Sequence, residues 1–238
     1  MHHKIVKTPG RPEELHFGAR PAIKTEGRSS GTTARKTMKK GLLVVFEGID
    51  GAGKSTQARA LVRKLRALGH DTAYFREPSR GRWGRELKRK AKTTGSLTPE
   101  EELALFQADR RDNVERNLKP ALRRGRIVVL DRYYFSTIAY QGAKGIDRTR
   151  IRRMNERFAP RPDLVFVLDI GAAEGLARIA NRKSKDLLFE RELYLVRVRR
   201  TFRSFRGRGM IHVDARRGRE EIRRLVLDTT LGLLKKRA

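Results

Sequence analysis

Cysteine is absent from the 238 residues, which excludes a disulfide framework, a thiolate zinc site, an iron–sulfur cluster and a cysteine nucleophile. Long apolar runs are also missing: the longest, residues 41–46, has six residues, whereas a membrane-spanning helix needs about 20. No signal-peptide core follows the basic start. These absences predict a soluble, cytoplasmic protein that folds by packing alone and has no membrane partner.

Acidic residues are scarce, with 27 Asp or Glu against 57 Lys or Arg, so the formal net charge is +30. The excess is mostly arginine, with 40 Arg against 17 Lys. Such a charge favours anionic partners by long-range attraction, including nucleotides, nucleic acid and acidic membranes. A compositional bias that is simply solvated at the surface explains it about equally well. The charge alone therefore names no ligand.

Residues 1–40 contain ten Lys or Arg, three Glu and no apolar periodicity. This composition predicts a basic, disordered N-terminal extension, because it buries too little apolar surface to offset the entropy of ordering. A misassigned start before Met38, a basic nucleic-acid arm and a weak organellar leader all remain open as explanations. Residues 41–238 are expected to form one domain.

Short β-rich runs alternate with longer helical patterns from residue 41 onward. Most of the runs are almost continuously apolar, which is typical of parallel strands covered by helices on both faces. The pattern predicts an α/β protein with three layers, α/β/α, around a central five-stranded parallel sheet. Helices are expected after residue 54 and from the capping-box sequence at residues 98–101. The predicted strands are residues 42–46, 72–75, 126–130, 164–170 and 210–213.

The segment from Gly48 to Ser55 matches the phosphate-binding loop pattern G-x-x-x-x-G-K-[ST] at every fixed position. It lies between a predicted strand and an amphipathic helix, as the pattern requires. Glycines let backbone N–H groups turn toward phosphate oxygens, Lys54 reaches the β- and γ-phosphates, and Ser55 is placed to ligate Mg²⁺. The P-loop NTPase fold follows. The residues expected to bind ATP are Gly48, Ile49, Asp50, Gly51, Ala52, Gly53, Lys54, Ser55 and Thr56.

A second signal is the apolar run of residues 127–130, which ends in Asp131. A carboxylate at this place, beside a phosphate loop, commonly holds Mg²⁺ or its water shell. A plain turn residue is the alternative reading of Asp131. Ser55 and Asp131 are the predicted metal-side residues, and Mg²⁺ is the predicted cofactor.

At this point the sequence resembles the thymidylate kinases, a family of nucleoside monophosphate kinases that use ATP. The resemblance covers roughly residues 41–236, and its central segments are specific to that family rather than to phosphate-loop proteins in general. The segments that carry it occur in family order: 46–56 (FEGIDGAGKST), 76–78 (REP), 105–110 (LFQADR), 119–122 (KPAL), 131–133 (DRY), 139–142 (AYQG) and 159–164 (APRPDL).

The resemblance implies an acceptor site for dTMP. Phe106 would stack on thymine, Arg110 would hydrogen-bond a thymine carbonyl, and Tyr140 would exclude a 2′-hydroxyl, while a core aromatic and solvated polar groups are the plain alternatives. Asp50 would lie near the sugar, and Arg76 and Arg132 would face the dTMP phosphate. The residues expected to contact dTMP are Asp50, Arg76, Arg80, Phe106, Arg110, Arg132, Thr137, Tyr140 and Gln141.

A helical lid over residues 172–189 is also implied by the resemblance. Because the phosphate loop has Gly51-Ala52 and no arginine, the lid would supply the arginine that touches the transferring phosphoryl group, and Arg182 is the predicted residue. A solvated basic helix is the alternative. The predicted catalytic residues are Lys54, Arg132, Arg182 and Asp50.

The expected function is phosphorylation of dTMP to dTDP by ATP, and the resemblance implies a homodimer. Two departures leave alternatives open. After the REP segment the family usually continues with two glycines and a threonine, whereas residues 79–84 here read SRGRWG, and the lid segment runs one residue longer than the common spacing. A kinase for another nucleoside monophosphate is therefore one alternative. The other is a nucleic-acid-associated protein that retains a nucleotide site.

Overall fold

The computed structural model describes residues 41–91, 97–179 and 185–237, and the side chains of residues 185–189 are not among those described. The N-terminal segment 1–40 lies outside the described residues, so its predicted disorder stays a prediction. All described residues fall in one compact unit that begins at Thr37. None of the helices in the described part has the length and apolarity to cross a bilayer.

A single sheet of five parallel strands organises the described residues, in the order β2-β3-β1-β4-β5. This confirms the predicted fold class. The strands agree with the predicted ranges to within one or two residues, and the third extends one residue further, so that Asp131 is its last residue. They are β1 (Leu42–Glu47), β2 (Thr72–Arg76), β3 (Ile127–Asp131), β4 (Leu164–Asp169) and β5 (Met210–Asp214).

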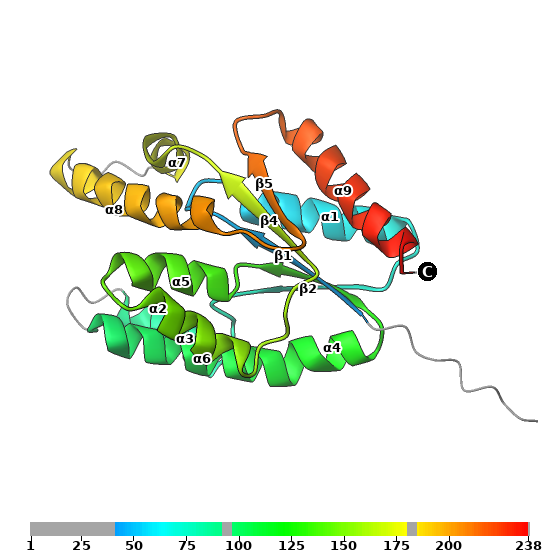
Figure 1. Ribbon diagram of the computed structural model, residues 1–238, viewed down its shortest axis with the longest axis horizontal. Helices are drawn as coiled ribbons and strands as arrows, with labels where there is room; N and C mark the ends of the chain where they lie inside the picture. Colours follow the sequence, from blue (N-terminus) through cyan, green and yellow to red (C-terminus); the bar gives the residue numbers. More distant parts are fainter. Residues whose placement is uncertain (1–40, 92–96, 180–184, 238) are drawn as a thin grey trace, which may run out of the picture. The chain divides into compact units, whose positions relative to one another are not determined.

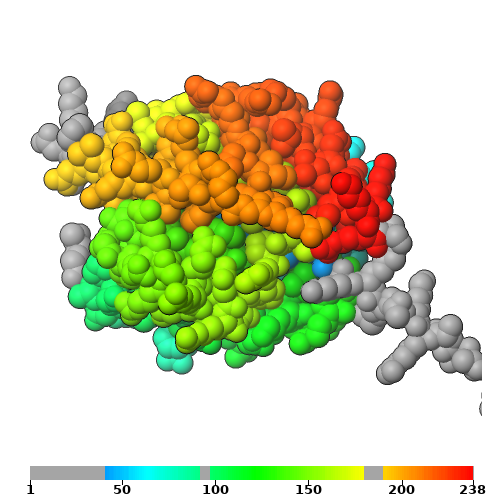
Figure 2. Space-filling model, viewed as in Figure 1, coloured from blue at the N-terminus to red at the C-terminus, as the bar shows by residue number. Residues whose placement is uncertain are grey.

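The three central strands are buried on both faces, as their continuous apolar sequences predict. The edge strands β2 and β5 are more exposed. Helices α1 and α9 pack together on one side of the sheet, and α3 and α5 lie on the other (Figure 1). From the direction of Figure 1, the helices hide most of the sheet (Figure 2). The core is therefore two apolar layers, one on each side of β1, β3 and β4.

Local sequence signals predicted two helices, one after residue 54 and one from residue 98, and both are present as α1 and α3. Thr98 and Glu101 form the predicted capping box at the start of α3: the Thr98 side chain accepts from the Glu101 amide, and the Glu101 side chain accepts from the Thr98 amide. No sequence pattern predicted η1, a turn of π-helix that continues α3. The helices are α1 (Lys54–Ala67), α2 (Arg82–Lys90), α3 (Pro99–Asn113), η1 (Val114–Leu118), α4 (Lys119–Arg123), α5 (Tyr134–Ala143), α6 (Arg148–Glu156), α7 (Ala172–Ile179), α8 (Lys185–Ser204) and α9 (Arg219–Lys235).

All five strands run in the same direction, so their carboxyl ends meet at one edge of the sheet. The phosphate loop follows β1 there, and Arg132 follows β3. In the segment predicted to be a lid, α7 and the start of α8 are helical, whereas residues 180–184 lie outside the described residues. Ligands of open parallel sheets bind at this carboxyl edge, and the two cavities described next lie along it.

Candidate active site

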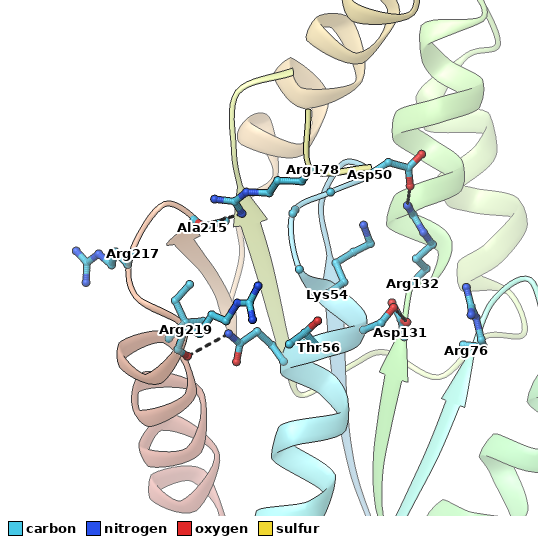
Figure 3. Close-up of a pocket in the computed structure, with 16 residues that line it drawn as sticks. Asp50, Lys54, Thr56, Arg76, Asp131, Arg132, Arg178, Ala215, Arg217 and Arg219 are labelled. Atoms are coloured by element: carbon cyan, nitrogen blue, oxygen red, sulfur yellow. Dashed lines mark hydrogen bonds and ion pairs between the residues drawn. The ribbon is translucent and has the colours of Figure 1, made fainter. Parts of the chain in front are cut away.

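The larger of the two cavities, called here the donor cavity, has a volume of about 580 Å³ and lies over the phosphate loop (Figure 3). Residues 50–56 of the predicted ATP site line it; Gly48 and Ile49 do not, and Ile49 is buried beneath the loop. Across from the loop, four residues complete the wall, one from α7 and three from the segment between β5 and the start of α9: Arg178, Ala215, Arg217 and Arg219. This wall is rich in arginine, which suits a polyanion.

The phosphate loop needs its glycines for conformation and for space. Gly48, Gly51 and Gly53 have φ values of +136°, +80° and +91°, in a region that other residues rarely adopt. At Gly51 a Cβ atom would lie 2.1 Å from the carbonyl oxygen of Gly175 in α7. The loop is therefore packed tightly against the helix that begins the predicted lid segment.

Lys54 is the first residue of α1 and is buried. Its Nζ donates to the carbonyl oxygen of Ile49, 2.7 Å away, across the turn of the loop. Burial lowers the pKa of Lys54 to about 7, and the positive charge of Arg132 adds to the effect. Among the described residues no carboxylate forms an ion pair with Lys54, and bound phosphate would supply an anionic partner.

Ser55 and Asp131 meet beside Lys54, as predicted. The Ser55 hydroxyl donates to Asp131 Oδ2 at 2.5 Å, and the Tyr74 hydroxyl donates to the same oxygen at 3.1 Å. The described residues include no group of three His, Cys, Asp or Glu side chains placed to hold a metal. Mg²⁺ typically takes only one or two protein oxygens and fills its other positions with phosphate and water. A hydroxyl and a buried carboxylate next to a phosphate loop fit that ion.

Arg132 joins the donor cavity to a second cavity, and both are lined by Arg132 and Asp50. The Arg132 guanidinium forms an ion pair with Asp50 and donates to the Ser136 hydroxyl at 3.1 Å. Its backbone has φ +70°, the one positive value among non-glycine residues of the described part. Such a conformation is strained for arginine, and strain of this kind is concentrated at functional sites.

The second cavity, called here the acceptor cavity, has a volume of about 370 Å³. It brings together seven of the predicted dTMP-contacting residues: Asp50, Phe106, Arg110, Arg132, Thr137, Tyr140 and Gln141. The Tyr140 ring lies under the Arg132 guanidinium, 5.3 Å from its central carbon. Aromatic walls with a few directed polar groups are what a nucleoside requires.

Arg110 is almost completely buried, and three side chains hold it. Its Nε donates to Glu77 at 2.7 Å, and its terminal nitrogens donate to Asn155 at 2.7 Å and Thr137 at 2.9 Å. Asn113 donates to the other oxygen of Glu77 at 3.2 Å. Burial raises the pKa of Glu77, and the charge of Arg110 opposes that rise. The guanidinium is thus fixed in place with two N–H groups outside this network.

Three predicted residues do not join these groups in the acceptor cavity. Arg76 lines the donor cavity instead. Arg80 lines a separate cavity of about 420 Å³ at the end of β2, which Arg76 also borders. Arg182 lies outside the described residues, so its predicted role stays a prediction.

Several residues of the site were not predicted from the sequence. Glu77 is the middle residue of the REP segment, but its partner Arg110 is 33 residues away, so no local pattern reveals the pair. Tyr194 of α8 and the ion pair of Glu102 with Lys144 lie at the acceptor cavity. Arg217 and Arg219 follow the last strand, and the convergence of strand ends was a signal that would have found them.

Comparison with known proteins adds independent findings. The family model described as thymidylate kinase matches residues 46–226. A thymidylate kinase of Akkermansia muciniphila is 50% identical over 184 residues, covering 77% of this chain and 88% of the relative. A thymidylate kinase of Brachyspira hyodysenteriae is 41% identical over 190 residues, covering 80% and 93%. A probable thymidylate kinase of Archaeoglobus fulgidus is 41% identical over 197 residues, covering 82% and 98%.

Proposed function

This chain belongs to the thymidylate kinase family, and from that premise we propose that it transfers the γ-phosphoryl group of ATP to dTMP, forming dTDP and ADP. The observation that carries the proposal is the meeting of two cavities at Arg132 and Asp50. One cavity has the walls of a triphosphate site, and the other has the walls of a nucleoside site. Their junction is where a phosphoryl group would pass.

In the proposed reaction an oxygen of the dTMP phosphate attacks the γ-phosphorus, and the bond from that phosphorus to the β–γ bridging oxygen breaks. The acceptor phosphate is already an anion, so no general base is needed. The protein aligns the two nucleotides and offsets negative charge. Mg²⁺, held by Ser55 and Asp131, would neutralise charge on the ATP phosphates.

The charge-stabilising groups come from three directions. The phosphate loop offers backbone N–H groups, and Lys54 would turn from the Ile49 carbonyl to the β- and γ-phosphates. Arg132 faces the junction from the opposite side. We assign the third direction to Arg182 of the predicted lid, in keeping with the arginine-finger role.

The acceptor cavity accounts for selectivity in the proposal. Phe106 would stack on thymine, while Arg110, held by Glu77, would donate to a thymine carbonyl through an N–H outside its internal network. Tyr140 would fill the space of a 2′-hydroxyl. Gln141, buried and with its Oε1 atom unpartnered, offers the acceptor that the N3–H of thymine needs. Arg80 lies at a different cavity, so we leave it out of the acceptor contacts.

The test is ADP release with ATP and Mg²⁺, with dTMP, dUMP, dCMP, UMP, CMP and AMP offered separately. We expect a strong preference for dTMP. Lys54→Ala should lower kcat by about 10³-fold, the order seen when one charge-stabilising donor is removed. Lys64→Ala is the matched control, because Lys64 is an exposed lysine of the same helix that lines neither cavity.

Other outcomes point elsewhere. Preference for a different monophosphate would show that the SRGRWG segment has changed the acceptor. Absence of turnover with every acceptor, together with polynucleotide binding that weakens steeply with salt, would favour the nucleic-acid-associated alternative.

We further propose a homodimer located in the cytoplasm, on the strength of the family relationship and of the place where ATP and dTMP occur. Light scattering at assay concentration tests the first part. Twice the chain mass of 27.3 kDa supports the dimer, and 27.3 kDa contradicts it.

A further inference from the structure

Glu47, the last residue of β1, is a carboxylic acid with no solvent exposure, and it lines neither the donor nor the acceptor cavity. A buried carboxylate is unfavourable unless it is well hydrogen-bonded. The phosphate loop begins at the next residue. Glu47 is therefore buried next to the site at a position that is unfavourable for a carboxylate, and it does not reach a ligand in either cavity.

The three groups that donate to Glu47 belong to Tyr133, in the turn between β3 and α5, and to Ser136, in the first turn of α5. Oε1 accepts from the backbone N–H of Tyr133 at 2.8 Å and from that of Ser136 at 3.1 Å. Oε2 accepts from the Ser136 hydroxyl at 2.5 Å. Tyr133 is the N-cap residue of α5 and makes no side-chain cap bond of its own. A side chain from another element thus satisfies the first amides of α5.

The turn that Glu47 holds is the one that carries Arg132. The Arg132 side chain donates to the same Ser136 hydroxyl at 3.1 Å, so a chain of hydrogen bonds runs from Arg132 through Ser136 to Glu47. The Arg132 amide donates to the carbonyl oxygen of Phe46, the residue before Glu47, at 3.0 Å. Hydrogen bonds therefore connect both the backbone and the guanidinium of Arg132 to the last two residues of β1.

We propose that Glu47 is a positioning residue, which holds the strained backbone of Arg132 and orients its guanidinium toward the junction of the two cavities. The inference rests on the proposed function, in which Arg132 faces the phosphoryl groups. It extends that function by one residue that touches neither nucleotide. Arg132 at φ +70° would relax toward a commoner conformation without such a hold.

The direction of the hydrogen bonds makes a carboxylate the suitable group. Ser136 has one hydroxyl hydrogen, which it gives to Glu47, and its oxygen is then left to accept from Arg132. An amide at position 47 has a single acceptor oxygen, so its NH₂ group would face either the two backbone N–H groups or the Ser136 hydroxyl, and one of these bonds to position 47 would be lost. Burial raises the pKa of Glu47 to about 7, while the bond from Ser136 and the charge of Arg132 oppose the rise.

The experiment compares wild type, Glu47→Gln, Ser136→Ala and the double variant, each also in an Arg132→Ala background. kcat and KM for both substrates are measured with melting temperatures. We expect Glu47→Gln to lower kcat by about 10- to 100-fold, the size expected for a misplaced group near the reaction, with KM for ATP changed by less than about threefold. Thr230→Val, which removes a buried hydroxyl of α9, is the control and should leave kcat unchanged.

The non-additivity of the changes in kcat between single and combined variants decides whether the proposal holds. Ser136→Ala should remove most of the effect of Glu47→Gln, and in the Arg132→Ala background Glu47→Gln should change kcat by less than about twofold. An equal loss with and without Arg132, or an unchanged kcat in Glu47→Gln, would overturn the proposal. If Glu47→Gln does not fold, Ser136→Ala alone decides: an unchanged kcat overturns the proposal, and a loss that depends on Arg132 supports it.

Failure of the proposed function would look different. In that case the wild type itself would release no ADP with dTMP, and no variant comparison would arise. A wild type that phosphorylates dTMP, together with a fully active Glu47→Gln, would reject the positioning role and leave the proposed function intact.

Discussion

The acceptor and donor cavities are built in opposite ways, although they share Arg132 and Asp50. In the acceptor cavity the central cation, Arg110, is buried and already bonded to Glu77, Thr137 and Asn155. In the donor cavity the outer wall is made of the exposed arginines Arg178, Arg217 and Arg219, and the buried Lys54 donates to the carbonyl oxygen of Ile49.

The two cavities therefore differ in whether their cations are already bonded to protein groups or are exposed. A nucleobase is recognised by geometry, and in the acceptor cavity the protein's own side chains already fix the central cation. A triphosphate is recognised largely by charge, and cations that move toward it serve that purpose. Removing a group from the acceptor cavity should therefore affect stability and binding together, whereas removing one from the outer donor wall should affect only binding.

The largest expected effect comes from breaking the acceptor network. Glu77→Ala leaves Arg110 buried without its anion, and we expect the free energy of unfolding to fall by about 3 to 5 kcal/mol. Glu115→Ala is the control, because its ion pair with Lys119 is exposed and should contribute less than about 1 kcal/mol. Urea unfolding measures both.

A double variant separates stability from recognition. Glu77→Leu with Arg110→Met replaces the ion pair by apolar side chains and should recover most of the stability. It should still fail to select dTMP, because it lacks Arg110, the proposed donor to thymine. A Glu77→Ala protein as stable as wild type would show that the acceptor cavity is not rigidly pre-assembled.

The second prediction concerns pH and compares the two buried glutamates. Glu77 forms an ion pair with Arg110, whereas Glu47 accepts hydrogen bonds from neutral donors. Burial raises the pKa of Glu47 to about 7. Between the ordinary value near 4.5 and about 7, the folded protein holds a proton on Glu47 that the unfolded chain releases. The contribution of Glu47 to stability is therefore present at low pH and is lost as pH rises through that window.

Glu47→Gln cannot titrate, so it isolates this contribution from that of Glu77. We expect the free energy of unfolding of wild type, relative to Glu47→Gln, to fall by up to about 3 kcal/mol from pH 5 to pH 8. Urea unfolding at four pH values without nucleotide gives the difference. A difference that stays constant, or that grows with pH, would contradict the raised pKa.

The same contrast explains how much of the molecule could be predicted from its sequence. The strands and the phosphate loop were predictable because periodicity and fixed spacing are local. Phe106 and Arg110 were placed together by their four-residue spacing in α3 and by the family resemblance. The sequence does not show which distant carboxylates complete the two arginine networks, Glu77 for Arg110 and, through Ser136, Glu47 for Arg132.

Arg80 shows how sequence order and the position of a side chain can differ. Its position after the REP segment indicated a phosphate contact, yet in the structure it lines another cavity with Arg76. Residues 79–84 lead into α2, whose direction is set by packing against α3 rather than by local sequence. Linear proximity to a motif therefore does not establish membership of the site.

The third prediction tests the contact between the phosphate loop and α7. In Gly175→Ala the new Cβ would lie 2.6 Å from the carbonyl oxygen of Asp50. We expect a loss of about 1 to 3 kcal/mol in stability, the usual result of overpacking, together with a lower kcat because Asp50 must shift. Gly232→Ala in α9 is the control: it meets nothing within 4 Å and should gain about 0.5 to 1 kcal/mol. A fully active and stable Gly175→Ala would show that the phosphate loop can move away from α7 without cost to the fold or the activity.

The smallest expected effect is on the outer donor wall. Arg219 is exposed and lines the donor cavity, so Arg219→Ala should raise KM for ATP by about two- to fivefold and leave the melting temperature unchanged. The increase should shrink between 50 and 500 mM salt, because exposed charges are screened. Arg224→Ala is the control, since this exposed arginine of α9 lies outside the donor cavity. A loss of stability in Arg219→Ala, or an effect on KM that is insensitive to salt, would show that the outer donor wall is as fixed as the acceptor network, and the contrast between the two cavities would then fail.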